Sequence, residues 1–330
     1  MINVESHPNI IEWESFMLKH LLQISDLSRE QIEQLILRAQ YFGINSPNIA
    51  PSLLSKKGFL STLFFENSTR TRASFELAAH TLGIKTINLD INTSSVKKDE
   101  SMIDTFQTLA AMGCRYFVVR HSESNILEKI VSEHPALSSA CHFVNAGDGH
   151  HAHPTQGLLD MLTIYQAQKK SEIDFSHLRV GILGDSVHSR VAKSDIVALK
   201  LLGCRDIRLI GPDSWLVEPE EYVTSQTNPL NKSVMEDLDV IITLRVQKER
   251  MAYLDLALLN DYVEHFQLTS ERLKWAKPDA IVMHPGPINR GIEMTSEVAD
   301  GNQSFILKQV SNGVLMRTAV LEAMSEVRTE

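Results

Sequence analysis

The sequence predicts an α/β protein made of two parallel-sheet α/β domains, with the candidate binding site in a cleft between them. Strand-like apolar runs alternate with helical segments along the chain, which is the pattern of parallel sheets covered by helices. The chain has 330 residues, and a single hydrophobic core rarely grows past about 250–300 residues. Polar side chains follow several of the strands, and open α/β sheets bind ligands at the carboxyl ends of their strands. Two such edges that face each other would form one interdomain cleft.

The first helix is predicted at residues 28–43. Ser28 and Gln31 are the residue pair of a capping box, in which each side chain bonds the backbone N–H of the other residue. Apolar residues recur at positions 32, 35, 36 and 39, the spacing of a helix with one buried face. Gly43 is expected to end this helix. Residues 46–57 contain Pro and Ser and are expected to connect it to the first strand.

A strand followed by a helix frames the segment Ser-Thr-Arg-Thr-Arg at residues 68–72. Residues 59–65 are apolar and β-prone, and apolar residues recur at helical spacing from residue 73 to residue 82, before Gly83 ends the helix. Backbone N–H groups at a helix start are unpaired and carry partial positive charge, so they attract anions. A capped helix with solvated arginines would explain one hydroxyl, but not three hydroxyls and two guanidiniums in five residues. We therefore predict a phosphate-binding segment, since Arg matches phosphate oxygens with two N–H groups.

The rest of the first half continues to alternate between strand and helix. The expected elements are strand 85–90, helix 101–111, strand 116–119, helix 124–133 and strand 141–144. Gly113 is expected to end the helix at 101–111, and Arg120 and His121 follow the strand at 116–119. Residues 92–100 are polar and without periodicity, so taken alone they predict a solvated loop.

The second half has the same organisation. The expected elements are helix 155–168, strand 179–183, helix 189–202, strands 206–210, 237–244 and 280–283, and helix 305–324. Residues 251–268 are expected to be loop and short helices. Gly184 follows a strand, as at the start of a dinucleotide-binding unit, but the glycine-rich fingerprint is absent from residues 185–190.

Composition excludes several classes of function. The formal net charge of −9 argues against nucleic acid as a partner, so an anion site requires a local concentration of arginines. No apolar run approaches the roughly 20 residues that cross a bilayer, and the N-terminus lacks the pattern of a signal peptide. Cys114, Cys141 and Cys204 are too scattered for a disulfide framework and are expected to be reduced and buried. These features predict a cytoplasmic protein.

Three histidines, His150, His151 and His153, raise the question of a metal site. The neighbouring sequence has no Cys, Asp or Glu at a matching spacing, so we expect no metal, and no cofactor motif is found. His150 and His151 are expected to be loop residues. Pro154 fits the first turn of the helix that follows.

Six motifs resemble, in the same order, those of the aspartate and ornithine carbamoyltransferases. They are Ser68-Thr69-Arg70-Thr71-Arg72, Lys97-Lys98, Arg120-His121, His153-Pro154-Thr155-Gln156, Arg245-Val246-Gln247 and His284-Pro285-Gly286-Pro287. The resemblance implies a carbamoyl phosphate-binding domain at residues 1–153 and an aspartate-binding domain at 154–302. A C-terminal helix within 303–330 would cross back and complete the first domain. The cleft between them would then be the active site.

The resemblance also implies the roles of individual residues. The phosphate would be held by Ser68, Thr69, Arg70 and Thr71, and the carbonyl oxygen would be contacted by Thr71, Arg120 and His153. The carbamoyl amine would be bound by Gln156, Gly286 and Pro287, and the aspartate by Arg190, Arg245 and Gln247. A neighbouring subunit would contribute Ser94 and Lys98. The family more often has glycines in the loop that carries the last pair, where Val96 and Asp99 stand here. Carbamoyl phosphate carries its own leaving group, so the reaction needs orientation and charge stabilisation rather than a covalent intermediate or a protein general base.

Aspartate is the expected acceptor of the carbamoyl group, in an early step of pyrimidine biosynthesis. Its two carboxylates require two cations beyond the phosphate site, and Arg190 and Arg245 meet that requirement. An ornithine enzyme needs an acidic pocket and typically has His-Cys-Leu-Pro where this chain has His284-Pro285-Gly286-Pro287. Two alternatives remain open: a carbamoyltransferase for ornithine or a related amine, and a non-catalytic carbamoyl phosphate-binding homologue.

The resemblance implies an assembly as well. A loop donated by a neighbour means that a lone monomer lacks a complete site, so a homotrimer with shared active sites is expected. Residues 287–291 are similar to those of family members that associate with a dihydroorotase-like chain rather than with a zinc-containing regulatory chain. A partner chain of either kind is therefore possible, and no nucleic acid or membrane partner is expected.

Overall fold

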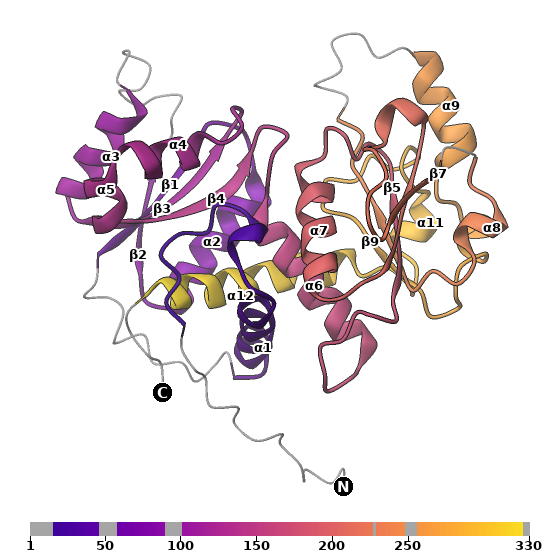
Figure 1. The fold of residues 1–330 in the computed structure, drawn as a ribbon, viewed down its shortest axis with the longest axis horizontal. Coiled ribbons are helices and arrows are strands. Elements are labelled where there is room, and N and C mark those ends of the chain that lie inside the picture. The colour runs from indigo at the N-terminus through magenta and orange to yellow at the C-terminus, as the bar shows by residue number, and fades with distance from the viewer. Residues whose placement is uncertain (1–15, 46–57, 90–100, 227–228, 248–255, 326–330) are drawn as a thin grey trace, which may run out of the picture.

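The computed structural model describes residues 16–45, 58–89, 101–226, 229–247 and 256–325. They form two sheets that lie side by side in Figure 1, one of four strands in the order β2-β1-β3-β4 and one of five in the order β7-β6-β5-β8-β9. Every neighbouring pair of strands is parallel. The predicted class, two parallel-sheet α/β domains, is confirmed.

The first sheet and its helices come from the N-terminal half. The strands are β1 (Phe59–Phe64), β2 (Lys85–Leu89), β3 (Cys114–His121) and β4 (His142–Asp148). The helices are η1 (Ile24–Asp26), α1 (Arg29–Asn45), α2 (Thr69–Thr81), α3 (Met102–Ala111), α4 (Ile126–Glu133) and α5 (Pro135–Ala140). Ser28 and Gln31 form the predicted capping box at the start of α1, with backbone-to-side-chain distances of 2.9 and 3.3 Å.

The second sheet is built from the C-terminal half. Its strands are β5 (Arg179–Leu183), β6 (Asp206–Ile210), β7 (Val223–Gln226), β8 (Val240–Thr243) and β9 (Ile281–Met283). The helices of this half are α6 (Pro154–Gln168), α7 (Arg190–Leu201), η5 (Asp213–Trp215), α8 (Lys232–Met235), α9 (Leu256–Phe266), α10 (Ser270–Leu273), α11 (Ser296–Ala299) and α12 (Ile306–Met324).

Helices α6 and α12 join the two halves. Twelve consecutive residues of α6, from Pro154 to Tyr165, are buried, as expected for a helix that is packed on all sides. Helix α12 packs against α1, α2 and α6, so the last described helix returns to the N-terminal half (Figure 1). One core cluster contains Leu60 of β1, Leu158 of α6 and Val180 of β5. A continuous core of this kind fixes the two sheet edges relative to each other.

Several predicted boundaries were wrong. Helix α1 continues past Gly43, where a Cβ atom would lie 3.0 Å from Leu315 Cδ1 of α12; the glycine permits close helix packing instead of ending the helix. Strand β3 extends through Arg120 and His121, and β4 extends to Asp148. Within residues 251–268, the structure describes an eleven-residue helix, α9, instead of short helices and loop.

Other expectations about local structure are met. All three cysteines are free and buried, as predicted. Gly83 follows α2 with a φ of 71°, the left-handed conformation typical of a helix end. None of the described helices is both long enough and apolar enough to span a bilayer. The expected connector 46–57 and the expected loop 92–100 lie outside the described residues.

Candidate active site

A cleft of about 710 Å³ brings the predicted site residues together. Twelve of them line it: Ser68, Thr69, Arg70, Thr71, Arg120, His153, Gln156, Arg190, Arg245, Gln247, Gly286 and Pro287. They come from the ends of β1, β3, β4, β5, β8 and β9 and from the segments that follow these strands. The two remaining predicted residues, Ser94 and Lys98, lie outside the described residues. Positions scattered over 220 residues of sequence thus meet because parallel strands present their carboxyl ends at one edge.

One end of the cleft is formed by the N-terminus of α2. Ser68 is the N-cap residue, and its hydroxyl makes no capping hydrogen bond; it therefore remains a donor toward the cleft, with the first N–H groups of the helix beside it. Thr71 is buried one turn further along. Arg72 is not among the lining residues, because it is two positions from Arg70 on the helix and points elsewhere. Its guanidinium lies 5.1 Å from the ring centre of Phe64, so of the two arginines in the predicted phosphate segment only Arg70 lines the cleft.

Arg120 and Arg190 approach each other across the two halves of the chain, and Glu66 binds both. The Glu66 carboxylate lies 3.4 Å from Arg120 Nε and 2.8 Å from Arg190 NH2. Arg190 also donates to the Gly149 carbonyl at 3.3 Å. A Cβ atom at Gly147 would lie 3.0 Å from both guanidiniums. Glycine, which has no Cβ atom, therefore leaves room for both arginine side chains beside this part of the backbone. Glu66, two residues after the end of β1, thereby holds together two cations that are 70 residues apart in the sequence.

His153 is the N-cap residue of α6 and is buried, with 4% of its surface exposed. Its backbone N–H donates to Ser194 Oγ at 2.9 Å, which holds the residue against α7. Burial, and then Arg120, hold the pKa of the imidazole well below its usual value. The ring is therefore neutral near pH 7 and keeps one N–H to donate.

Gln156 lies one turn further along α6, and its side chain has a defined orientation. The amide nitrogen donates to Asp160 at 3.0 and 3.2 Å. Because the NH₂ group is held in this way, the amide oxygen is left as the acceptor at the cleft. Asp160 also accepts the amide of Gln309 at 2.7 Å, so this carboxylate orients two side chains that line the site.

The other wall of the cleft consists of two loops that follow β8 and β9. Buried Glu293 joins them: one carboxylate oxygen accepts the N–H of Val246 at 2.8 Å, and the other accepts the N–H of Asn289 at 2.8 Å. The second loop is also attached to α12, because the N–H of His284 donates to Gln309 Oε1 at 2.8 Å. These bonds hold the backbone directly after Arg245 and on either side of the Pro-Gly-Pro segment.

The cleft is strongly electropositive although the chain is acidic. Five arginines line it, namely Arg70, Arg120, Arg190, Arg245 and Arg317, and no carboxylate belongs to its described lining. Burial, followed by Arg70 and Arg245, lowers the pKa of His284 to about 3, and burial with Arg245 lowers the pKa of Arg70. Such a site suits ligands with several negative charges.

Helix α12 contributes residues that our sequence reasoning did not identify. Gln309, Gly313 and Arg317 line the cleft, and the Arg317 guanidinium lies 5.1 Å from the ring centre of Phe75. Polar residues at helical spacing on an otherwise apolar helix were the available signal. Without the position of α12 in space, that signal could not be connected to a cleft whose other lining residues all come before residue 288.

Glu128, Asp148 and His151 are the described residues that could together hold a metal ion, with ligand atoms within 4.8 Å of one another. His151 Nδ1 lies 3.0 Å from Asp148, and Glu128 comes from α4. The spacing in the sequence did not indicate this group, because Glu128 lies 20 residues before Asp148 and approaches it only in the folded chain. Asp148 already accepts two backbone N–H groups, from Asn125 at 2.6 Å and Ala152 at 3.0 Å. That no metal is needed remains a prediction.

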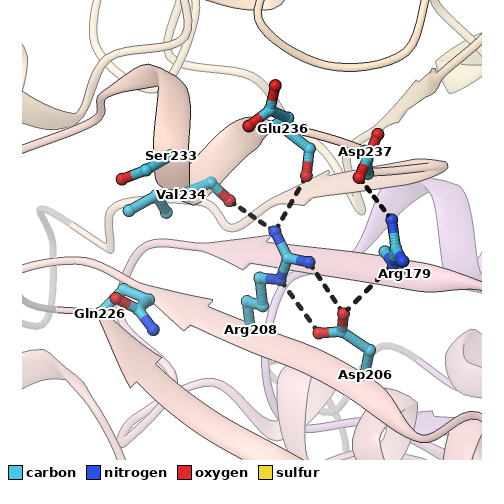
Figure 2. Close-up of a pocket in the computed structure, with 8 residues that line it drawn as sticks. All are labelled: Arg179, Asp206, Arg208, Gln226, Ser233, Val234, Glu236 and Asp237. Carbon is cyan, nitrogen blue, oxygen red and sulfur yellow. Dashed lines mark hydrogen bonds and ion pairs between the residues drawn. The ribbon is translucent and has the colours of Figure 1, made fainter.

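A second pocket, of about 410 Å³, lies where β5 and β6 begin (Figure 2). Its two arginines already have carboxylate partners: Arg208 donates to both oxygens of Asp206 at 3.0 and 2.8 Å, and Arg179 lies 2.6 Å from Asp237. With Glu236, three carboxylates oppose two guanidiniums. This pocket therefore lacks the excess positive charge of the cleft.

Comparison with known families agrees with this arrangement. Residues 19–166 match the carbamoyl phosphate-binding domain of the aspartate/ornithine carbamoyltransferases, and residues 176–324 match the aspartate/ornithine-binding domain of the same family. The chain belongs to the aspartate/ornithine carbamoyltransferase family.

Individual relatives point to one branch of this family. The chain is 47% identical over 310 residues to an aspartate carbamoyltransferase catalytic subunit of Legionella pneumophila, covering 93% of this chain and 99% of the relative. Its structure resembles aspartate transcarbamoylase from Trypanosoma cruzi in complex with carbamoyl aspartate and phosphate, with a TM-score of 0.80, 29% identity and 94% and 96% of the two chains covered. The fold is also shared with ornithine carbamoyltransferase from Gloeobacter violaceus, at 23% identity and a TM-score of 0.73 over 94% and 99%.

Proposed function

We propose that this chain is the catalytic chain of an aspartate carbamoyltransferase. It transfers the carbamoyl group of carbamoyl phosphate to the α-amine of L-aspartate and releases N-carbamoyl-L-aspartate and phosphate, a reaction of pyrimidine biosynthesis. The observation that carries the proposal is the lining of the cleft, which has five arginines and no carboxylate among its described residues; Glu66, which pairs with Arg120 and Arg190, lies outside that lining. A phosphate and two substrate carboxylates need such a surface, whereas the ammonium of ornithine would be repelled by it.

The phosphate of carbamoyl phosphate binds at the start of α2. Backbone N–H groups of the first turn, the hydroxyls of Ser68, Thr69 and Thr71 and the Arg70 guanidinium supply donors to its oxygens. These donors belong to one helix end, so they are oriented before the substrate arrives. Such preorganisation lowers the cost of bringing two anions into the same cleft.

The carbonyl oxygen of the carbamoyl group is polarised by Thr71, Arg120 and His153. Negative charge develops on this oxygen when the amine attacks, and preorganised donors stabilise it. Neutral His153 is suited to this task because it donates an N–H without acting as an acid. Gln156 accepts a hydrogen bond from the carbamoyl amine through the oxygen that its bond to Asp160 leaves available.

Aspartate binds on the side of the cleft formed by the second sheet. Arg190 and Arg245 pair with its two carboxylates, with Gln247 as a further polar contact. The deprotonated α-amine forms a bond to the carbonyl carbon, a tetrahedral intermediate results, and the bond to the phosphate oxygen breaks. We assign the amine proton to the departing phosphate, so the reaction uses no general base from the protein.

The assembly that we propose is a homotrimer in which Ser94 and Lys98 complete the neighbouring site. This rests on the resemblance alone, since both residues lie outside the described ranges. The division at residues 153 and 302, the cytoplasmic location and a dihydroorotase-like or regulatory partner chain are proposed on the same basis. A fully active monomer in analytical ultracentrifugation would rule out the shared site.

The first experiment measures product formation by the purified chain from carbamoyl phosphate with L-aspartate, with L-ornithine and without an acceptor. Carbamoyl aspartate formed with aspartate alone is the expected result. Citrulline formed with ornithine would show that the Arg190 and Arg245 side has been misassigned. Absence of turnover, with phosphate binding retained in calorimetry, would favour a non-catalytic carbamoyl phosphate-binding homologue.

A further inference from the structure

Two aspartates lie against each other behind the cleft, in a place that the reaction itself does not explain. Asp160 is on α6 and Asp195 is on α7, and neither has any exposed surface. The two carboxyl groups interact with each other, and both oxygens of Asp195 are buried without a donor of their own. Two buried carboxylates cannot both remain ionised side by side, because their repulsion adds to the cost of burying each charge. The pair therefore retains one proton.

The partners of each aspartate indicate which one holds that proton. Asp160 accepts amide N–H groups from Gln156 and Gln309 and faces the buried guanidinium of Arg317. Asp195 has no N–H donor at either oxygen among the described residues. Donors and a cation favour the ionised form at Asp160, so the proton belongs on Asp195, whose O–H donates to Asp160. Burial raises the pKa of both carboxyl groups, and the neighbouring Asp160 raises that of Asp195 still more.

This bond acts on the candidate active site through Gln156. The Asp160 carboxylate holds the Gln156 amide at 3.0 Å and the Gln309 amide at 2.7 Å, and Gln309 in turn accepts the backbone N–H of His284. Parts of α6, α7 and α12 and the loop after β9 thus converge on one carboxylate. If Asp195 could not donate, the carboxylate would lose its only partner from α7 among the described residues and could turn away from Gln156.

We propose that Asp195 is a positioning residue: as a neutral carboxylic acid it donates its proton to Asp160, and this bond orients the Gln156 amide toward the carbamoyl group. The effect on the carbamoyl group rests on the proposed function. The sharing of a proton between Asp160 of α6 and Asp195 of α7 is independent of that function. No other titratable side chain is described as acting on the pair, apart from Arg317 of α12 on Asp160.

Three variants separate positioning from stability. Asp195→Asn keeps a donor, Asp195→Ala removes it, and Leu199→Ala is a matched control that opens a cavity on the same helix at a residue with no exposed surface. For Asp195→Ala we expect kcat/KM for carbamoyl phosphate to fall about tenfold to hundredfold, as for one lost buried hydrogen bond. Asp195→Asn should restore most of it, and Leu199→Ala should lower the melting temperature without this fall.

The pH dependence gives a second readout. A folded-state pKa above the ordinary value of Asp means that the native protein holds a proton that the unfolded chain has released, so stability falls as pH rises between the two values. The parent protein should lose stability from pH 5 to 8 relative to Asp195→Asn, in which the amide replaces the shared proton. Its kcat/KM for carbamoyl phosphate should also fall more steeply above pH 7 than that of Asp195→Asn.

Infrared difference spectroscopy between the parent protein and Asp195→Asn tests the proton without turnover. A carboxylic acid band of the parent at pH 7, absent from Asp195→Asn, is expected. Absence of that band, or equal impairment of Asp195→Asn and Asp195→Ala, would overturn the inference. If the parent itself forms no carbamoyl aspartate, the proposed function fails, and the infrared and stability measurements still decide whether the proton is shared.

Discussion

Replacement of Arg190 by alanine should affect one substrate of the proposed reaction far more than the other. The side chain is buried, with 8% of its surface exposed, and it reaches the cleft from the first turn of α7. It is assigned to aspartate, whereas the residues assigned to carbamoyl phosphate lie chiefly on α2, β3 and α6. The variant therefore separates the two halves of the site.

The size of the effect follows from the contacts. Removal of one partner from a buried, hydrogen-bonded charge pair costs about 2–5 kcal/mol, and each 1.4 kcal/mol corresponds to about a factor of ten. Glu66, which lies 2.8 Å from Arg190, keeps Arg120 at 3.4 Å as a partner, so the cost should fall in the lower part of that range. We expect kcat/KM for aspartate to fall by about thirtyfold to three-hundredfold, and KM for carbamoyl phosphate to change by less than about threefold.

The assay is steady-state kinetics in which each substrate is varied at saturating concentrations of the other. Arg208→Ala is the matched control, because Arg208 is an ion-paired arginine in the same half of the chain but lies in the other pocket (Figure 2). Glu66→Gln combined with Arg190→Ala shows how much of the loss arises from the carboxylate left behind. Equal losses for the two substrates, or an unchanged KM for aspartate, would refute the assignment of Arg190.

Three further predictions concern stability, ionisation and reactivity. Glu322→Gln should lower the free energy of unfolding by about 3 kcal/mol in denaturant titrations, because it removes the negative charge that accepts two hydrogen bonds of 2.6 Å from the buried Arg38 guanidinium. Stability should recover when Arg38→Met and Glu322→Leu are combined, and a loss below about 1 kcal/mol for Glu322→Gln would contradict this expectation. His153 should show no NMR titration above pH 6, because burial and Arg120 lower its pKa; a midpoint near 6.5 would mean that the ring is solvated. Burial raises the pKa of Cys204 to about 11, so a thiol reagent at pH 8 should label this residue only after unfolding, and rapid labelling of the native protein would be inconsistent with its burial.

Local sequence patterns were sufficient for most elements. The apolar run of β1, the capping box of α1 and the strand-to-helix turn at Ser68 each depend on neighbours within a few residues, so they can be inferred without the fold. Boundaries were less well predicted where contacts decide them. Gly43 should end a helix by its own preference, but close packing of α1 against α12 retains it in the helix interior. Arg120 and His121 extend β3 because β1 and β4 offer hydrogen-bonding partners on either side.

The sequence by itself determined the two-sheet α/β class and the family, because alternation and ordered motifs are properties of the chain order. It also identified twelve residues that line the cleft. Only the tertiary structure placed Glu66 between Arg120 and Arg190, turned Arg72 toward Phe64, brought Arg317 of α12 into the cleft and set Asp160 against Asp195. Each of these is a contact between elements, or an orientation around a helix axis. Long-range packing decides such relations, and linear spacing carries no information about them.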